Sequence, residues 1–399
     1  MTHMKRMIWE RGFRVRLLSL LLSLLMLLSA CASKLPSDGE SSDSSGDDTT
    51  EDSVEIPDAD EDLPALTVVD VSKAMYTYTE MEEDLTALAN AYPTLLSVRS
   101  LGQSPDKREI YCAVVGSTDA EKQIVIHGGI HAREYMTSLL VMKQLEYYLA
   151  EYNTAEYKGK TVKEWFSEYC IYVVPMSNPD GVTISQYGSQ GIRDEMLRKK
   201  LRDIYESDAS YGFATTSAGE VMDFETYLRY WKANANGVDL NRNYDAGWED
   251  YNDIISPCFR GYKGPSPESE PETKAMVSLV NSLPNLVTLI SMHAQGKVLY
   301  WDCGQEDTAP GLRLVHAIQE MTGYTVIYAK NNDASLNDWV ILKKGLPSAT
   351  VEIGNVKCPL PIDQFDSIWE ECRDLWLLLA ELYSVDPSES TGEESTAEG

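Results

Sequence analysis

The chain has 399 residues and a formal net charge of −29 at pH 7. So negative a balance argues against nucleic acid and anionic membrane surfaces as partners. The length allows two or three domains, or one large α/β domain of about 300 residues. Seven cysteines without C-x-x-C spacing argue against a structural zinc knot. The six cysteines beyond Cys31 leave both disulfides and buried free thiols open.

A basic segment that ends at Arg16 precedes an apolar stretch, 17–28, which is too short to span a bilayer comfortably. The sequence Leu28-Ser-Ala-Cys31 follows and resembles a bacterial lipobox. Residues 1–30 are therefore predicted to be a lipoprotein signal peptide, with Cys31 lipidated. An ordinary signal peptide that contains a cysteine is the alternative. The prediction places the mature protein outside the cytoplasmic membrane, attached to it only through the lipid.

Two acidic segments flank the central part of the chain. Residues 31–70 and 386–399 are rich in Ser, Asp, Glu, Gly and Thr. Segments with so little apolar surface cannot offset the entropy lost on ordering, so a disordered tether and a disordered tail are predicted. The folded domain is expected to occupy residues 71–385.

Helical and strand patterns alternate through this domain. Apolar residues at helical spacing predict helices at 79–92, 138–152, 193–206, 268–282, 311–322, 336–344 and 364–384. Apolar and β-branched runs predict strands at 95–98, 109–115, 123–126, 170–175, 286–292, 324–328 and 348–353. This alternation indicates a mostly parallel sheet covered by helices on both faces. The charged helix at 193–206 is expected to form a rim over the cleft.

The most informative motif follows the predicted strand at 123–126. Two glycines break the strand, and His131 and Glu134 then stand three residues apart. Imidazole nitrogen and carboxylate oxygen are ligands of catalytic zinc, which takes three protein ligands and leaves a position for water. Among five histidines, His293 is the candidate third ligand, because it ends an apolar strand. A His–Glu pair also arises by chance in loops, but strand-to-helix junctions are where α/β sheets bind ligands.

Further motifs follow in a fixed order. They are Asn178-Pro-Asp-Gly181, Gly237-Val-Asp-Leu-Asn-Arg-Asn243, Ser291-Met-His293 and Thr350-Val-Glu-Ile-Gly354. With the His–Glu pair, this ordered set resembles the zinc metallocarboxypeptidases of the carboxypeptidase A/B (M14) family over roughly residues 76–383. The resemblance implies an α/β/α sandwich with a mixed, mostly parallel eight-stranded sheet. It also implies one Zn²⁺ per chain, held by the two histidines and the glutamate.

The same resemblance assigns roles to two carboxylates. Asp239 matches the family position that accepts the other ring N–H of the first ligand histidine and so fixes its tautomer. Glu352 matches the general base that takes a proton from the zinc-bound water and passes it to the leaving amine. Without the motif match, Asp239 would be interpreted as an ordinary turn residue, and Glu352 as an edge-strand residue that points to solvent.

Five further residues match substrate-binding positions of the family. Asn241 and Arg242 look like the pair that binds the substrate's terminal carboxylate, and Arg133 like a secondary carboxylate-binding arginine. Tyr328 matches the mobile tyrosine that closes over the substrate, with a core tyrosine as the alternative. Asn337 falls at the specificity position, where it is neither acidic nor apolar.

The chain departs from the family pattern at one catalytic position. The family usually has an arginine near the zinc that stabilises the oxyanion, and Lys232 stands there instead. A lysine supplies a point charge in place of a planar fork. Arg198 or Arg229 could supply the cation instead.

The sequence thus predicts a monomeric, extracytoplasmic zinc carboxypeptidase that acts on peptides. The segment 230–243 resembles bacterial members that cleave γ-D-glutamyl–diaminopimelate bonds, so cell-wall stem peptides are candidate substrates. One rival is a zinc amidase or endopeptidase on the same fold, which should lack the Asn-Arg pair. The other is a non-catalytic binding lipoprotein, which should have lost a ligand or Glu352.

Overall fold

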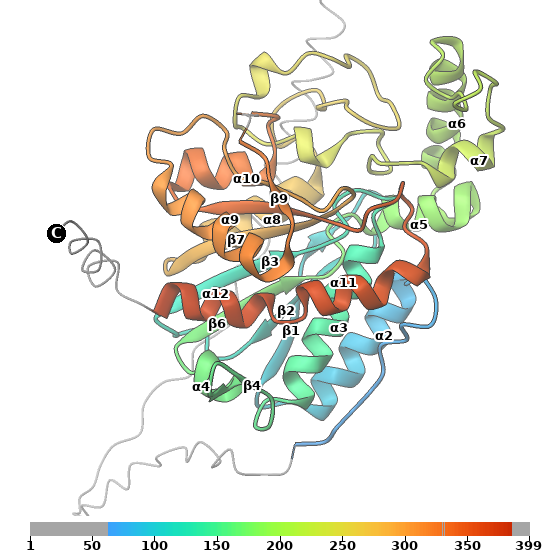
Figure 1. Ribbon diagram of the computed structural model, residues 1–399. Helices are drawn as coiled ribbons and strands as arrows, with labels where there is room; N and C mark the ends of the chain where they lie inside the picture. The colour runs from blue at the N-terminus through green and yellow to red at the C-terminus, as the bar shows by residue number, and fades with distance from the viewer. Residues whose placement is uncertain (1–62, 329, 331, 385–399) are drawn as a thin grey trace, which may run out of the picture. The chain divides into compact units, whose positions relative to one another are not determined.

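The computed structural model describes residues 63–328, 330 and 332–384 (Figure 1). The predicted signal peptide, Cys31, most of the predicted tether and the predicted tail at 386–399 lie outside these residues. Within the described part of the chain, no helix is both long and apolar enough to cross a membrane.

A mixed sheet forms the centre of the described domain. Its strands lie in the order β1 (Leu96–Gln103), β2 (Glu109–Val115), β6 (Tyr169–Val174), β3 (Lys122–His127), β7 (Leu286–Ala294), β10 (Ser348–Ile353), β8 (Val298–Tyr300) and β9 (Thr325–Val326). β6, β3, β7 and β10 run parallel, and so do β8 and β9, whereas β1, β2 and β8 join their inner neighbours antiparallel. The predicted eight-stranded α/β/α fold is confirmed. A hairpin of two short strands, β4 (Glu156–Tyr157) and β5 (Lys160–Thr161), is separate from this sheet.

Helices cover both faces of the sheet. One layer contains α2 (Tyr78–Ala91), α3 (Met136–Ala150), α9 (Ala309–Thr322), α11 (Phe365–Cys372) and α12 (Leu375–Ser384). The other contains α8 (Pro271–Asn281) and α10 (Leu336–Trp339). Successive strand residues face opposite layers, so Ile124 and Ile126 pack against the first layer and Val125 against the second. Both sides of β3 are therefore apolar, as expected of a central parallel strand.

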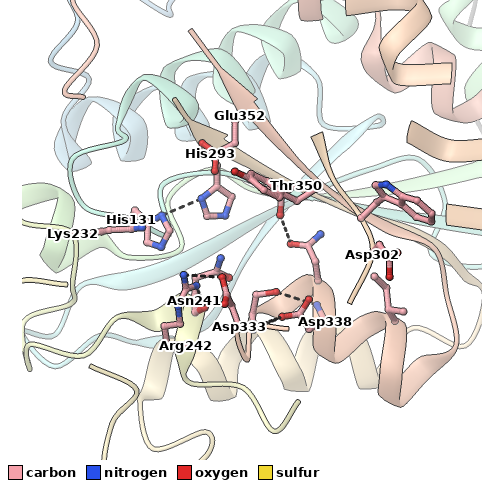
Figure 2. Close-up of a pocket in the computed structure, with 15 residues that line it drawn as sticks. His131, Lys232, Asn241, Arg242, His293, Asp302, Asp333, Asp338, Thr350 and Glu352 are labelled. Atoms are coloured by element: carbon pink, nitrogen blue, oxygen red, sulfur yellow. Dashed lines mark hydrogen bonds and ion pairs between the residues drawn. The ribbon is translucent and has the colours of Figure 1, made fainter. Parts of the chain in front are cut away.

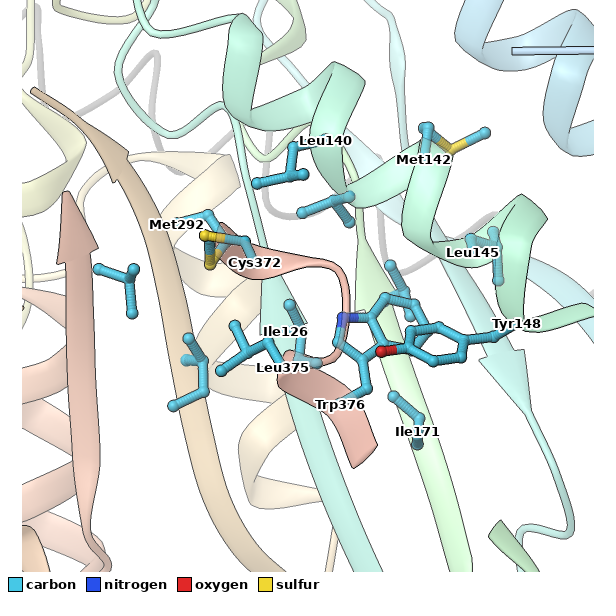
Figure 3. Close-up of a cluster of buried hydrophobic side chains, with 14 of the residues drawn as sticks. Ile126, Leu140, Met142, Leu145, Tyr148, Ile171, Met292, Cys372, Leu375 and Trp376 are labelled. Carbon is cyan, nitrogen blue, oxygen red and sulfur yellow. The ribbon is translucent and has the colours of Figure 1, made fainter. Parts of the chain in front are cut away.

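Aromatic packing fixes α3 against the C-terminal helices. The fully buried ring of Trp376 stacks on Tyr148, with centroids 4.9 Å apart. Its indole N–H donates to Gln144 at 3.2 Å. Figure 3 shows this pair beside Ile126 and Ile171 of the sheet. Because α3 begins directly after the His–Glu motif, this packing holds the motif's C-terminal end in place.

Three helices form a separate group beside the sheet: α5 (Pro179–Tyr187), α6 (Glu195–Ser210) and α7 (Phe224–Arg229). The short helix α4 (Val162–Phe166) packs with the first layer. α6 corresponds to the charged helix predicted at 193–206. With α5 and α7 it encloses its own apolar cluster, at the centre of which Trp231 is fully buried. The N–H of the next residue, Lys232, donates to the carbonyl of Phe259 at 2.9 Å, which fixes the backbone that leads into the site.

The sequence patterns misplaced several boundaries. The helix predicted at 364–384 is two helices, α11 and α12. The one predicted at 336–344 is a single α-helical turn followed by the π-helical segment Val340–Lys344. The strand predicted at 324–328 shrinks to β9. β8 was not predicted at all, because three residues carry no readable periodicity.

Packing begins before the predicted domain start at residue 71. Val69 is buried, and the backbone N–H groups of Val68 and Val69 donate to the carboxylate of Glu146 at 2.6 and 2.7 Å. A buried carboxylate needs such partners, so Glu146 anchors this segment to α3. All six described cysteines are free and buried, which is the buried-thiol alternative.

Candidate metal centre

The His–Glu motif lies in the loop between β3 and α3, and glycine allows the chain to turn there. Gly129 has φ +63°, and a Cβ at this position would lie 2.5 Å from the hydroxyl oxygen of Ser138. Only glycine adopts this conformation in so little space. The turn brings His131 and Glu134 back towards the end of β7, where His293 lies.

Three side chains converge at this point. Nδ1 of His131 lies 3.0 Å from Nδ1 of His293 and 3.0 Å from Oε1 of Glu134, whose Oε2 lies 3.1 Å from His293 Nδ1. These donor atoms all lie within 4.8 Å of one another, and the three side chains are buried. Figure 2 shows the two imidazole rings next to each other, and their planes meet at 66°. The structure thus brings together the three residues predicted as ligands, from a loop and from a strand far apart in the sequence.

This donor set fits a divalent cation. Two imidazole nitrogens and a carboxylate converge on one buried point. Among the described residues, no lysine or arginine forms an ion pair with this carboxylate. Burial lowers the pKa of His293 to about 4, so its ring is neutral and keeps a lone pair for a metal. Two histidines and one glutamate form a set used by catalytic zinc.

Asp239 supports the first histidine from behind. Its Oδ1 lies 3.2 Å from Nε2 of His131, and its Oδ2 accepts the backbone N–H of Gly261 at 2.9 Å. Burial opposes ionisation, but the contact with His131 and the nearby charge of Lys232 hold the pKa of this carboxyl well below its usual range. An anionic acceptor at Nε2 leaves Nδ1 directed at the metal point.

We expect Asp239→Ala to weaken zinc binding by about 10–100-fold without abolishing it, because the ligand would lose the partner that fixes its tautomer. Competition with a chelator of known affinity would measure the change. Asp245→Ala, which removes an exposed aspartate paired with Lys343, is the matched control. Equal zinc affinity in the two variants would mean that Asp239 does not act through His131.

Glu352 lies beside the metal point because of strand register. β10 runs parallel to β7, and Glu352 pairs directly with His293. β10 lies between β7 and β8, so the interpretation of Glu352 as an edge-strand residue is wrong. Burial, and then the nearby charge of Glu134, raise the pKa of Glu352. A carboxyl with a raised pKa suits general acid–base work near neutral pH.

A cavity of about 240 Å³ opens over these residues. Its lining includes these predicted site residues: His131, Lys232, Asn241, Arg242, His293, Asn337 and Glu352. Of the three candidate oxyanion cations, Lys232 is the one in the cavity wall. Arg198 and Arg229 are not among its lining residues. The role of Lys232 itself stays a prediction.

Arg242 lies at the base of the cavity with one unused donor. Its guanidinium donates to the carbonyl of Asn241 at 2.7 Å and pairs with Asp333 at 3.0 Å. Its Nε is buried and has no partner among the described residues. The side-chain oxygen of Asn241 accepts the N–H of Leu336 at 3.2 Å. A buried donor without a partner is costly, so Arg242 keeps hydrogen-bonding capacity that its protein partners do not use.

The structure gives weaker support for the remaining residues predicted to bind substrate. Asn337 lines the cavity, but its amide donates to Ser348 at 2.7 Å and accepts from Thr350 at 3.1 Å. Tyr328 is 62% exposed and hydrogen-bonds through its hydroxyl to His316, outside the cavity lining. Arg133 is half-buried outside the lining and donates only weakly to the carbonyl of Tyr230, at 3.5 Å.

Several lining residues were not predicted. Tyr300 ends the short strand β8, and Trp301 and Asp302 follow it. Others surround α10, including Asp333, Ser335 and Asp338. The Ser335-x-x-Asp338 pattern is a helix-capping signal that could have been found in the sequence, and both capping hydrogen bonds are present. The residues after β8 offered no such signal.

A comparison with family models matches residues 81–374 to the family described as zinc carboxypeptidase (Peptidase_M14). The chain belongs to this family. The resemblance drawn from the ordered motifs is therefore confirmed. Because the family consists of zinc-dependent peptidases, the protein is a metallopeptidase, a hydrolase of amide bonds.

Individual members of the zinc carboxypeptidase family differ in their named activity. The chain is 32% identical over 311 residues to γ-D-glutamyl-L-diamino acid endopeptidase 1 of Lysinibacillus sphaericus, covering 77% of this chain and 72% of that protein. It is 26% identical over 319 residues to carboxypeptidase B of Astacus astacus, covering 74% and 92%. The crystal structure of carboxypeptidase A from Helicoverpa armigera superposes with a TM-score of 0.55 at 17% identity, over 78% of this chain and 74% of that one. That likeness supports the fold alone.

Proposed function

We propose that this member of the family is an exported, lipid-anchored zinc peptidase that cleaves the amide bond before a residue with a free carboxylate. We further propose that its substrates are short cell-wall peptides with a γ-glutamyl–diamino acid bond. One observation carries the first part: a single cavity is lined by the two histidines of the metal-ligand triad, by Glu352 and by Arg242, whose Nε has no partner among the described residues. The activity named for the Lysinibacillus sphaericus relative supports the second part. The lipobox-like sequence that ends at Cys31 supports export and anchoring.

The residues of the cavity divide the work of hydrolysis. His131, Glu134 and His293 would hold zinc, which when bound polarises the scissile carbonyl and lowers the pKa of a bound water to near 7. Glu352 would accept a proton from the attacking water and return it to the leaving nitrogen. Lys232 supplies positive charge beside the carbonyl oxygen as negative charge develops on it. The water, the base and the cation thus act at one carbonyl.

Arg242 and Asn241 select the substrate's end. The guanidinium of Arg242 lines the cavity, and its Nε has no partner among the described residues. The Asn241 oxygen is already engaged, so the Asn241 amide N–H₂ is the group left to donate. A free carboxylate on the released residue would receive both. This reading covers a carboxypeptidase and an enzyme that cuts a γ-glutamyl bond before a terminal diamino acid. The binding-lipoprotein alternative loses support because the full ligand set converges at one point and Glu352 pairs with one of its members, His293.

If Arg242 and Asn241 bind the carboxylate in this way (the carboxylate clamp), amidating the substrate's terminal carboxylate should lower kcat/KM by about 10–100-fold. The reason is that a hydrogen bond to a charged group contributes about 1.5–3 kcal/mol. Arg242→Ala should cause a similar loss on the free acid but little further loss on the amide, because both changes remove one interaction. Mass spectrometry of the products of L-Ala-γ-D-Glu-L-Lys and its amide would measure the rates.

Arg99→Ala, which removes an arginine of β1 outside the cavity lining, is the matched control for the loss of a guanidinium. Equal rates on acid and amide in the wild type would contradict the clamp. An endopeptidase or amidase that uses the same zinc would then be the better account.

A further inference from the structure

The cavity is electrostatically asymmetric. Lys232 and Arg242 lie on the side of the metal triad, whereas Asp302 lies on the opposite side, as Figure 2 shows. Asp333 and Asp338 also line it. The cavity volume, about 240 Å³, lies below the roughly 300–1,000 Å³ of pockets for drug-sized ligands. It therefore suits one residue of a peptide, with its carboxylate at Arg242 and its side chain directed away from the metal.

Two of the three aspartates are already engaged within the protein. Oδ2 of Asp338 accepts the backbone N–H groups of Asp333 and Ser335 at 2.9 and 3.0 Å, which caps α10. Asp333 pairs with Arg242 at 3.0 Å. Backbone N–H groups thus balance the charge of Asp338, and Arg242 balances that of Asp333.

Asp302 differs from both. Its Oδ1 accepts the N–H of Gly304 at 2.8 Å, and the described residues offer its other oxygen no donor within hydrogen-bonding distance. The neighbouring side chains of Trp301 and Cys303 are buried, so the backbone that carries Asp302 is held in place. The exposed Lys330 passes Gly304 without forming an ion pair with Asp302 among the described residues. A carboxylate oxygen thus remains available at the far side of a peptide-sized cavity.

We propose that Asp302 binds an ammonium group on the side chain of the released residue, so that the enzyme prefers a diamino acid at this position. This inference rests on the proposed function, since it takes the residue's carboxylate to lie at Arg242. Asn337 then forms part of the cavity floor, because Ser348 and Thr350 occupy its amide. Side-chain selection shifts from the position before Asp338 to the loop after β8.

The test compares two substrates that differ only in the side-chain ammonium: L-Ala-γ-D-Glu-L-Lys and L-Ala-γ-D-Glu-L-norleucine. The wild type should show a kcat/KM about 10–100-fold higher on the lysine peptide, as expected for a charge-assisted contact. Asp302→Asn should remove this preference and leave norleucine turnover and zinc content unchanged. Asp302→Glu should restore part of it. Glu306→Gln removes an exposed charge from the same loop outside the cavity and should behave as wild type.

Binding is measured separately, by calorimetry with both peptides on Glu352→Gln and on Glu352→Gln/Asp302→Asn. The lysine peptide should bind Glu352→Gln about 10–100-fold more tightly than the norleucine peptide, and the second substitution should abolish the difference. Equal affinity for the two peptides, or a difference that survives Asp302→Asn, overturns the assignment of Asp302 even if the protein cleaves neither. Selective lysine binding without cleavage by the zinc-loaded wild type would instead overturn the proposed function alone.

Discussion

Replacing Glu352 with glutamine should leave zinc content and fold intact but lower kcat by about three orders of magnitude. Glutamine has nearly the same shape, yet it cannot take a proton from water. General acid–base catalysis contributes about 10²–10⁴-fold, and here one residue is expected to serve both proton transfers. Steady-state kinetics on L-Ala-γ-D-Glu-L-Lys, with zinc measured by atomic absorption, would give both quantities.

The control for this change is Glu370→Gln, an exposed glutamate of α11 outside the cavity. It should retain wild-type turnover. Near wild-type kcat in Glu352→Gln would assign the proton transfers to another group. A loss of zinc together with activity would mean that Glu352 supports the metal instead of the proton.

His293→Ala should eliminate zinc binding and, with it, peptidase activity. The buried point would keep only one imidazole and one carboxylate, two ligands where catalytic zinc sites use three. Dialysed wild-type protein should contain about one zinc per chain, and the variant close to none. Atomic absorption measures the content, and added zinc should not restore turnover at micromolar concentration.

His316→Ala separates this effect from the loss of any histidine. His316 is exposed on α9 and contacts Tyr328, away from the cavity. Its replacement should change neither zinc content nor activity. Stoichiometric zinc in His293→Ala would show that the third ligand had been misassigned.

The chemical centre was predictable from sequence because its parts sit at recognisable strand ends. His131 and Glu134 follow a buried strand within one short motif, and His293 ends another apolar strand. The pairing of Glu352 with His293 was not predictable, because register between distant strands depends on the packed sheet. The family resemblance supplied the role of Glu352 as general base, but not its pairing with His293.

The residues on the side of the cavity away from the metal ligands were not predicted, for a different reason. Asp302 follows a strand of three residues, which is too short to show alternation. The ion pair between Arg242 and Asp333 joins segments about ninety positions apart without a shared motif. The break between α11 and α12 was missed as well, because apolar residues continue at helical spacing across it. Short elements and distant contacts depend on tertiary packing that local patterns do not record.

The direct pairing of Glu352 with His293 has a consequence for how this enzyme can diversify. Adjacent strands lie about 4.7–4.9 Å apart, so the distance between base and ligand is set by the repeat of the sheet, which loop changes leave untouched. The segments after β8 and before α10 carry no such constraint. Insertions and substitutions there can change the substrate-binding cavity while the positions of the catalytic residues stay the same. The architecture thus places the catalytic residues on the sheet and the residues that recognise the substrate on segments that can vary.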